Sequence, residues 1–479
     1  MKEYDLVLIG TGSGMNIVDV MIQRNPEVKV AVIDKDEPGG ICLTRGCIPS
    51  KMLLYSADLV RMIGTLAEFG IDVQLRAVNF QRIMNRTRMF IQSDINMIKE
   101  GLSHTRNIDY YKDIAEFIAP YTLKVGKETT IRAKMIILCT GSKPAIPPIT
   151  GLQETGYLTS DTVLALNQLP KSIAIVGGGY IAAEYGHFFS AMGSAVTIVG
   201  RNPQFLPDEE PEVSALAKRE LQRYMSILTN HEVIKTERAS ATNKKLVAVN
   251  RTDATKTEVT AEEILVATGR APNTDMLHPE EGGIRIDEQG WIIVNDYLET
   301  SQPNVWALGD ANGKYQFKHK ANYEALITYY NAILGKKVKT DYHAVPHAIF
   351  TYPEIASVGL TERVAREKYG RDKILIGFRR YQDTAKGETM DVKDDFVKVI
   401  VESGTMKVLG AHLIGPHASV LVQEIINLMY TPEQSADLIV NGMYIHPALT
   451  EVVQAAFHSL MTPEQYHHLI EEHYRLPTQ

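Results

Sequence analysis

Two of the three cysteines of this chain lie five positions apart, in the stretch GGICLTRGCIPSK from Gly39 to Lys51. Cys42 and Cys47 could ligate a metal, close a structural loop or exchange electrons as a reversible disulfide. A zinc site usually takes four ligands from two close pairs, and the sequence offers one pair, which disfavours a metal. A disulfide across so short a loop would constrain little, so redox chemistry is favoured.

The elements around these thiols would support redox chemistry. We expect both cysteines at the start of a helix that runs from Ile48 onward, where the free amide groups favour the thiolate. A turn from Leu43 to Gly46 would bring the two sulfurs within bonding distance, and the glycine eases that turn. The third cysteine, Cys139, follows an apolar strand and is expected to be buried and inert.

Length and charge exclude several classes of protein. The chain has 479 residues, too many for one core, so we expect two to four domains. A net charge of −7 without blocks of like charge argues against a nucleic acid or an anionic membrane as partner. No apolar run is long enough to span a membrane. A strand pattern begins by Leu6, so we expect no signal peptide, and the low cysteine content favours a reducing compartment, the cytoplasm.

A nucleotide-binding turn is predicted near the N-terminus. The apolar run Leu6–Ile9 is followed by GTGSG, by a helical pattern, and by a strand that ends at Asp34. Glycines let the backbone approach a pyrophosphate, and the helix N-terminus offers amide groups to the phosphates. Asp34 can accept hydrogen bonds from a ribose. The glycines of this turn are Gly10, Gly12 and Gly14.

The same pattern returns later in the chain. The strand 172–176 leads into GGGYIA, a helical face and the strand 196–199. Two such turns in a strand–helix context predict two nucleotide-binding units. The second unit continues Gly200-Arg201, where an NAD-preferring site would offer an acid. Because an arginine attracts the 2′-phosphate of NADP, this favours NADPH, unless Arg201 simply points to solvent.

The predicted fold is α/β, with two Rossmann-like nucleotide-binding domains and a C-terminal α+β domain. A rigid PAIPP segment ends the first unit, and the buried strands before Gly269 and Asp310 suggest that the chain returns to it. The pattern changes again near residue 340. The predicted division is 1–147 for the first part of the first domain, 148–268 for the second domain, 269–338 for the return and 339–479 for the third domain.

Together these stretches resemble the FAD-dependent pyridine-nucleotide disulfide oxidoreductases, which include dihydrolipoamide dehydrogenase and the glutathione, mycothione and mercuric reductases. The likeness covers essentially the whole chain. It is carried by GTGSG, the CxxxxC stretch followed by PSK, GGGYIAAE, ATGRAPN, ALGDANG, FTYPEIASVGLTE and HPALTE. The resemblance implies a homodimer with FAD, NAD(P) and interface domains, and these two cofactors without a resident metal.

The resemblance also implies residue roles. Cys47 would face the flavin as a thiolate, and Cys42 would attack the substrate disulfide. His446 of the partner subunit would serve as acid and base, with its ring oriented by Glu451; these two residues could also only mark the start of a helix. Lys51 would pair with Glu184, and Tyr180 would lie over the flavin as a movable gate. The residues implied for FAD are Gly10, Gly12, Gly14, Asp34, Lys51, Thr140, Gly141 and Asp310, and those implied for NAD(P) are Gly177, Gly179, Tyr180, Ala182, Arg201 and Gly269.

Some residues depart from the family pattern or have no clear role. Tyr444 stands where dihydrolipoamide dehydrogenases often carry a second histidine, and the C-terminal EEHYRLPTQ lacks the cysteine pair of mercuric reductases. Lys318 and Lys320 are most simply solvated charges, and His343 and His347 are uninformative.

Three functions are therefore expected, in this order. The first is dihydrolipoamide dehydrogenase, acting on a small dithiol or on a lipoyl domain of a 2-oxo acid dehydrogenase complex. The second is an NADPH-dependent reductase of a low-molecular-weight thiol disulfide. The third is a non-catalytic FAD-binding interaction protein.

Overall fold

The first sheet is built from strands that are far apart in the sequence. The computed structural model describes residues 1–474, and residues 475–479, the end of the EEHYRLPTQ segment, lie outside the described part. The strand order is β3-β2-β1-β6-β5-β4, and β17 pairs in parallel with β6. The strands are β1 (Lys2–Ile9), β2 (Val30–Ile33), β3 (Ile108–Tyr111), β4 (Ala115–Ala119), β5 (Thr122–Val125), β6 (Thr129–Leu138) and β17 (Val305–Ala307). The chain thus leaves this sheet after β6 and returns to it at β17.

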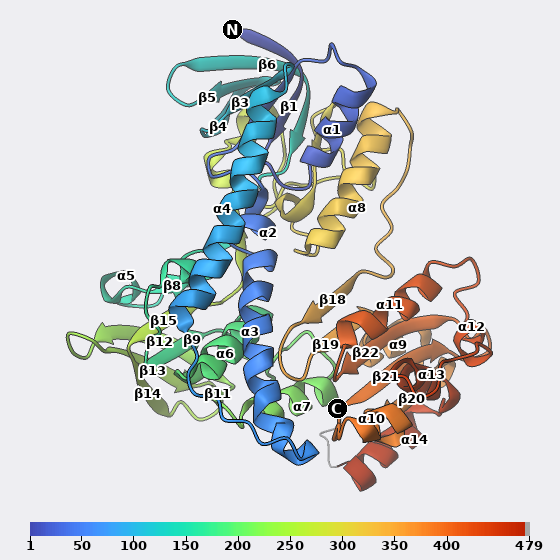
Figure 1. Cartoon of the computed structure of the whole chain (residues 1–479). Helices are drawn as coiled ribbons and strands as arrows, with labels where there is room; N and C mark the ends of the chain where they lie inside the picture. The colour runs from blue at the N-terminus through green and yellow to red at the C-terminus, as the bar shows by residue number, and fades with distance from the viewer. Residues whose placement is uncertain (475–479) are drawn as a thin grey trace.

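The β1 strand is buried on both faces, as expected for a central parallel strand. The helix α1 (Met15–Arg24) follows the glycine turn after β1 and lies beside α8 (Lys318–Thr328) on the sheet (Figure 1).

A second, fully parallel sheet follows the second glycine turn. Its strand order is β11-β10-β9-β15-β8. The strands are β8 (Leu158–Thr159), β9 (Ser172–Val176), β10 (Ala195–Val199), β11 (Ser226–Leu228) and β15 (Glu263–Val266). The helix α6 (Tyr180–Met192) begins at the turn and is buried along most of its length.

Smaller elements flank this second unit. The strands β12 (His231–Arg238), β13 (Lys244–Asn250) and β14 (Lys256–Ala261) form an antiparallel sheet. The strands β7 (Ser142–Pro144) and β16 (Arg270–Pro272) pair where the chain enters and leaves the unit. The helix α7 (Pro211–Leu221) extends from this unit toward the third sheet (Figure 1).

The third sheet is antiparallel, in the order β18-β19-β22-β21-β20. Its strands are β18 (Pro346–Ile349), β19 (Ile355–Gly359), β20 (Ile374–Arg380), β21 (Phe396–Glu402) and β22 (Val408–Ile414). The helices of this unit are α9 (Glu362–Tyr369), α10 (Ala385–Thr389), α11 (Ala418–Met429), α12 (Asp437–Val440), α13 (Thr450–His458) and α14 (Pro463–Leu469). The predicted α/β class with a C-terminal α+β unit is therefore confirmed.

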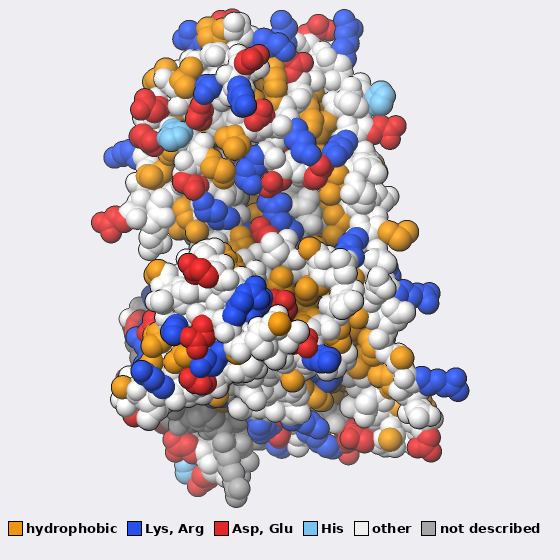
Figure 2. Space-filling model, turned by 90° about the vertical axis from the view of Figure 1, so that its left-hand side faces the viewer, with side chains coloured by type: hydrophobic (Ala, Val, Ile, Leu, Met, Phe, Trp, Pro, Cys, Tyr) orange, Lys and Arg blue, Asp and Glu red, His pale blue; other side chains and the backbone are white. Residues whose placement is uncertain are grey.

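Two long helices connect the units. The helices α3 (Cys47–Thr65) and α4 (Phe80–His104) lie side by side and run from the first sheet to the second unit (Figure 1). One buried hydrophobic cluster includes residues of α3, α6 and the third sheet, so these units share a core. Among residues 1–474, no helix has the length and apolar character needed to cross a membrane. On the face shown in Figure 2, acidic and basic side chains are intermixed.

Candidate redox site

The two thiols lie on two consecutive helices and contact each other. Cys42 is in the short helix α2 (Gly40–Thr44) and Cys47 is the first residue of α3, so the expectation of one shared helix was wrong for Cys42. The chain reverses between them at Gly46, where a Cβ atom would lie 2.9 Å from the carbonyl oxygen of Ile41. Glycine is therefore required there for close approach of the backbone, and the reversal lets the Cys42 and Cys47 thiols form a hydrogen bond.

This contact divides the pair into an acid and a base. The hydrogen bond from Cys42 lowers the pKa of Cys47 to about 6 against the opposing effect of burial, and the charge of Lys51 contributes in the same direction. The same contact, together with burial, raises the pKa of Cys42. Cys47 is therefore the thiolate and Cys42 the protonated thiol near neutral pH.

An ion pair lies one turn further along α3. The Nζ atom of Lys51 is 2.8 Å from both carboxylate oxygens of Glu184, which is on α6. The backbone N–H of Phe350, just after β18, also donates to Glu184. The structure thus brings Lys51 and Glu184 together, and the pair connects the thiol helix to the second and third units.

A cavity of about 1040 Å³ opens beside the thiols. A Cβ atom on Gly12 would meet nothing within 4 Å, so the turn leaves open space there. The buried hydroxyl of Thr140 has no hydrogen-bond partner among residues 1–474 and is free to bind a ligand. The lining includes Gly10, Gly12, Asp34, Cys42, Cys47, Lys51, Thr140, Gly141, Tyr180, Glu184 and Asp310.

Two residues of the first glycine turn also have structural roles. Asp34 accepts hydrogen bonds from the backbone and side chain of Thr11, at 2.8 and 2.6 Å, and so fixes the turn at the cavity edge. Gly14 does not line the cavity, and a Cβ atom there would lie 2.4 Å from the sulfur of Cys139. Cys139 is buried as expected, and burial raises the pKa of its thiol.

The residues predicted for NAD(P) form a separate group around the second glycine turn. Tyr180 is the member of this group that lines the thiol cavity; Gly177, Gly179, Ala182, Arg201 and Gly269 do not. A Cβ atom on Gly200 would lie 3.2 Å from the Cα atom of Gly178, so the turn and the end of β10 approach closely. Arg201 is exposed, and Arg251 donates to its backbone carbonyl oxygen at 3.2 Å.

The predicted acid–base pair is formed on the surface of the third unit. The Nδ1 atom of His446 is 2.8 Å from Glu451, whose other oxygen accepts the backbone N–H of Ala448. The His446 side chain is 70% exposed and does not line the cavity of its own chain. Met443 and Ile445, just before it, are also exposed. His446 and Glu451 are thus oriented outward among apolar side chains.

The expectation for the two lysines of α8 was wrong in part. Lys320 is 2% exposed, and its ammonium lies 2.9 Å from Glu324 and 2.8 Å from the side-chain oxygen of Asn312. Lys318 lines the cavity and donates to the hydroxyl of Ser13 at 3.0 Å. The spacing of Lys320 and Glu324, one helical turn, was the sequence signal for this buried pair.

The comparison with protein families gives the wider assignment. The sequence model described as pyridine nucleotide-disulphide oxidoreductase matches residues 4–325, and the dimerisation domain of the same family matches residues 345–457. The chain belongs to this family. Its members use FAD and NAD(P), so the resemblance deduced from the motifs is confirmed.

Individual relatives cover nearly the whole chain. Mycothione reductase of Mycobacterium tuberculosis is 35% identical over 95% of this chain and 99% of the relative. Dihydrolipoyl dehydrogenase of Synechocystis is 34% identical over 95% of this chain and 98% of the relative. The structure of the HOCl-induced flavoprotein disulfide reductase RclA from Escherichia coli is similar with a TM-score of 0.83, at 27% identity over 95% of this chain and 99% of that chain.

The cavity fits the FAD that the family uses. The open space at Gly12, the unpartnered hydroxyl of Thr140 and the acidic group of Asp34 suit the nucleotide half of FAD. The thiol pair and Lys51 lie further along the same cavity, where the reactive ring would be placed.

Proposed function

We propose that this protein is a flavin-dependent reductase of small disulfides that draws its electrons from NADPH. The observation that carries the proposal is the single cavity shared by the Cys47 thiolate, the Cys42 thiol and the Lys51–Glu184 ion pair. A metal site or a structural disulfide would not explain why one thiol of the pair is acidified. FAD supplies the exchange of an electron pair between the nicotinamide and the thiol pair.

The chain's own residues carry out the thiol–disulfide exchange. Cys42, as its thiolate, attacks one sulfur of the substrate disulfide, which forms a mixed disulfide and releases the first thiol. The Cys47 thiolate then attacks Cys42, which restores the Cys42–Cys47 disulfide and releases the second thiol. Two electrons thus pass from the thiol pair to the substrate, and the reverse sequence oxidises a dithiol.

Each leaving thiol needs a proton, and we assign its donor to the partner subunit. In a homodimer built through the dimerisation domain, the exposed His446 would enter the neighbouring chain's cavity. The partner's His446 would hold a proton at Nε2, since Nδ1 is bound to Glu451. The exposed apolar side chains of Met443 and Ile445 support a buried position for this segment in the dimer.

The proposed preference for NADPH depends on the end of β10. Gly200 provides no carboxylate that would repel a 2′-phosphate, and the exposed Arg201 is free to pair with one. Arg201→Glu is expected to raise the KM for NADPH by roughly 10- to 100-fold, the value of one charge-assisted contact, and to change that for NADH little. Steady-state kinetics with both nucleotides measure this.

An arginine on the same unit provides the control for this variant. Arg238 is exposed on β12, and Arg238→Glu makes the same charge change. It should leave the NADPH-to-NADH ratio unchanged. Equal ratios for Arg201→Glu and the wild type would remove the argument for NADPH.

Dihydrolipoamide oxidation is the second candidate, because dihydrolipoyl dehydrogenases are among the relatives at 34% identity. The site differs at Tyr444, whose hydroxyl donates to Glu424 at 2.9 Å where a second histidine would stand. We expect NADPH oxidation with one of a panel of small disulfides to exceed NAD⁺ reduction by dihydrolipoamide. A higher rate with dihydrolipoamide and NAD⁺ would establish the second candidate. FAD binding without turnover in any assay would leave only the interaction protein.

A further inference from the structure

A second histidine–glutamate pair lies in the wall of the cavity. The Nε2 atom of His347, on β18, is 2.5 Å from a carboxylate oxygen of Glu209, which lies just before α7. The other oxygen of Glu209 accepts the hydroxyl of Ser357 at 2.7 Å. The Glu209 side chain is 2% exposed, whereas that of His347 is 25% exposed and lines the cavity. Unlike His446, this histidine belongs to the cavity of its own chain.

The position of His347 connects it to the redox site. The ring of Phe317, another lining residue, stacks between His319 and His347, with centroid distances of 5.3 and 5.8 Å. Three residues after His347, the N–H of Phe350 donates to Glu184, the partner of Lys51. The strand that carries His347 therefore borders the part of the cavity that holds the reactive groups.

The groups around His347 leave it as the titratable cation of this wall. Burial lowers its pKa, but the hydrogen bond and the charge of Glu209 outweigh this and raise it, with a smaller contribution from Asp208. The neighbouring His319 donates through Nε2 to the carbonyl of Pro346, and burial lowers its pKa, so it is neutral at neutral pH. Beyond Ser357, His412 contacts that hydroxyl at 3.2 Å. When His347 loses its proton, the buried charge of Glu209 is left unbalanced at the cavity wall.

We propose that the His347–Glu209 pair sets the reduction potential of the bound flavin through the charge of the imidazole. A flavin gains negative charge on reduction, so a cation in the wall stabilises the reduced form and raises the potential. Loss of the proton from His347 reverses the effect. The pair is then a second acid–base group, additional to the partner's His446, that acts on the cofactor through charge. This inference rests on the proposed function, because it requires FAD in the cavity.

The test measures the midpoint potential of the flavin as a function of pH. A Cys47→Ser background removes the thiol pair as a second electron acceptor, so the flavin alone is titrated. Compared with that background, added His347→Gln is expected to lower the potential at neutral pH and to remove one inflection from its pH dependence. Added Glu209→Gln keeps the imidazole but removes the charge that raises its pKa, so the inflection should move to lower pH.

His343 provides the matched control. It also pairs with a carboxylate, since its Nδ1 atom is 2.7 Å from Asp341, but it does not line the cavity. His343→Gln should leave both the potential and its pH dependence unchanged. Curves for His347→Gln and Glu209→Gln that coincide with the background would overturn the inference and leave the proposed function intact. Wild-type protein that binds no FAD would instead overturn the proposed function.

If His347→Gln does not retain FAD, the inflection in Glu209→Gln decides the question alone. An inflection that stays at the wild-type pH in that variant would contradict the proposal.

Discussion

Replacement of Cys47 by serine is expected to abolish disulfide reduction and to leave the flavin bound. A serine hydroxyl is not ionised near pH 7 and cannot form a disulfide, so neither half of the exchange can be completed. By analogy with the removal of other catalytic nucleophiles, turnover should fall by about 10⁴-fold or more. The cavity is otherwise unchanged, so the purified variant should remain yellow. Assays of NADPH oxidation beside the flavin absorbance measure both effects.

The pH dependence of alkylation checks the assignment of the thiolate. Because the pKa of Cys47 is lowered to about 6, the reaction of the reduced protein with iodoacetamide should rise through pH 6. An ordinary thiol would show this rise near 8.5. The rise should be absent in Cys47→Ser and present in Cys139→Ala, which alters a buried thiol outside the exchange. A rise through pH 6 that persists in Cys47→Ser would show that Cys42 is the thiolate.

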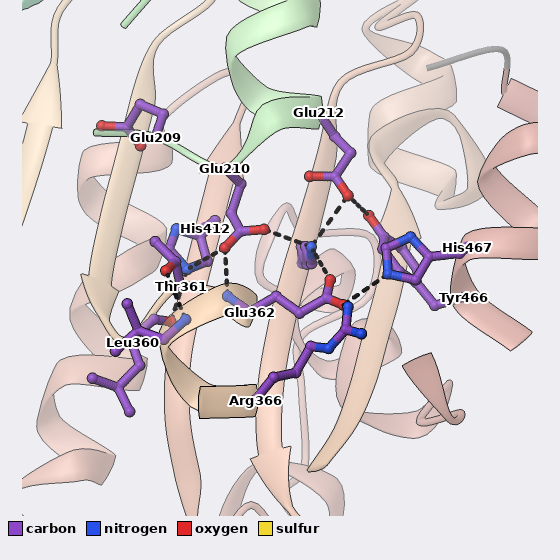
Figure 3. Close-up of polar contacts among 12 residues, drawn as sticks. Glu209, Glu210, Glu212, Leu360, Thr361, Glu362, Arg366, His412, Tyr466 and His467 are labelled. Carbon is purple, nitrogen blue, oxygen red and sulfur yellow. Dashed lines mark hydrogen bonds and ion pairs between the residues drawn. The ribbon is translucent and has the colours of Figure 1, made fainter. Parts of the chain in front are cut away.

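The largest effect on stability is expected at Lys398 on β21. Its side chain is fully buried, and its ammonium lies 2.6 Å from Glu210, 2.8 Å from Glu362 and 3.3 Å from Glu212. Figure 3 shows the three carboxylates converging from the starts of α7 and α9. Burial lowers the pKa of Lys398, but the carboxylates outweigh this and raise it, so the lysine remains charged.

Lys398→Met keeps a long apolar stem and leaves these carboxylates without their cation. Removal of one partner from a buried ion pair costs about 3–5 kcal/mol, and we expect a loss of this size in the free energy of unfolding. Urea denaturation of wild type and variant, followed by circular dichroism, measures it.

An exposed ion pair provides the control for Lys398→Met. Lys339 is 3.0 Å from Asp296, and both side chains are more than 60% exposed. Lys339→Met should cost about 0–1 kcal/mol, as is usual for exposed pairs. Equal stability of the two variants would show that the buried cluster contributes no more than a surface contact.

The parts of the site that depend on short-range spacing could be predicted from the sequence. The glycine turns and the CxxxxC stretch each form a local structure, and the motifs located Lys51, Glu184, His446 and Glu451. The division of the thiols between two helices depends on Gly46, whose close contact with the preceding turn is not visible in a sequence.

The buried charges could not be predicted in the same way. Lys398 meets Glu210 and Glu212 across more than 180 positions of sequence, and no periodic pattern marks such a pair. His347 had no assigned role because its partner, Glu209, is equally distant along the chain. Domain boundaries also stay a prediction, since the shared core of α3, α6 and the third sheet gives no sharp limit.

The acidic start of α7 has a consequence for how this protein can be rebuilt. Glu209 pairs with His347, and Glu210 and Glu212 pair with Lys398, so three successive carboxylates of the nucleotide unit end inside the C-terminal unit. A chimera that takes its nucleotide module from a relative would separate these charges from their counterparts. Module exchange therefore succeeds only when residues 209–212 are inherited together with β18 and β21, and cofactor specificity is more safely re-engineered at the end of β10 than by grafting the whole unit.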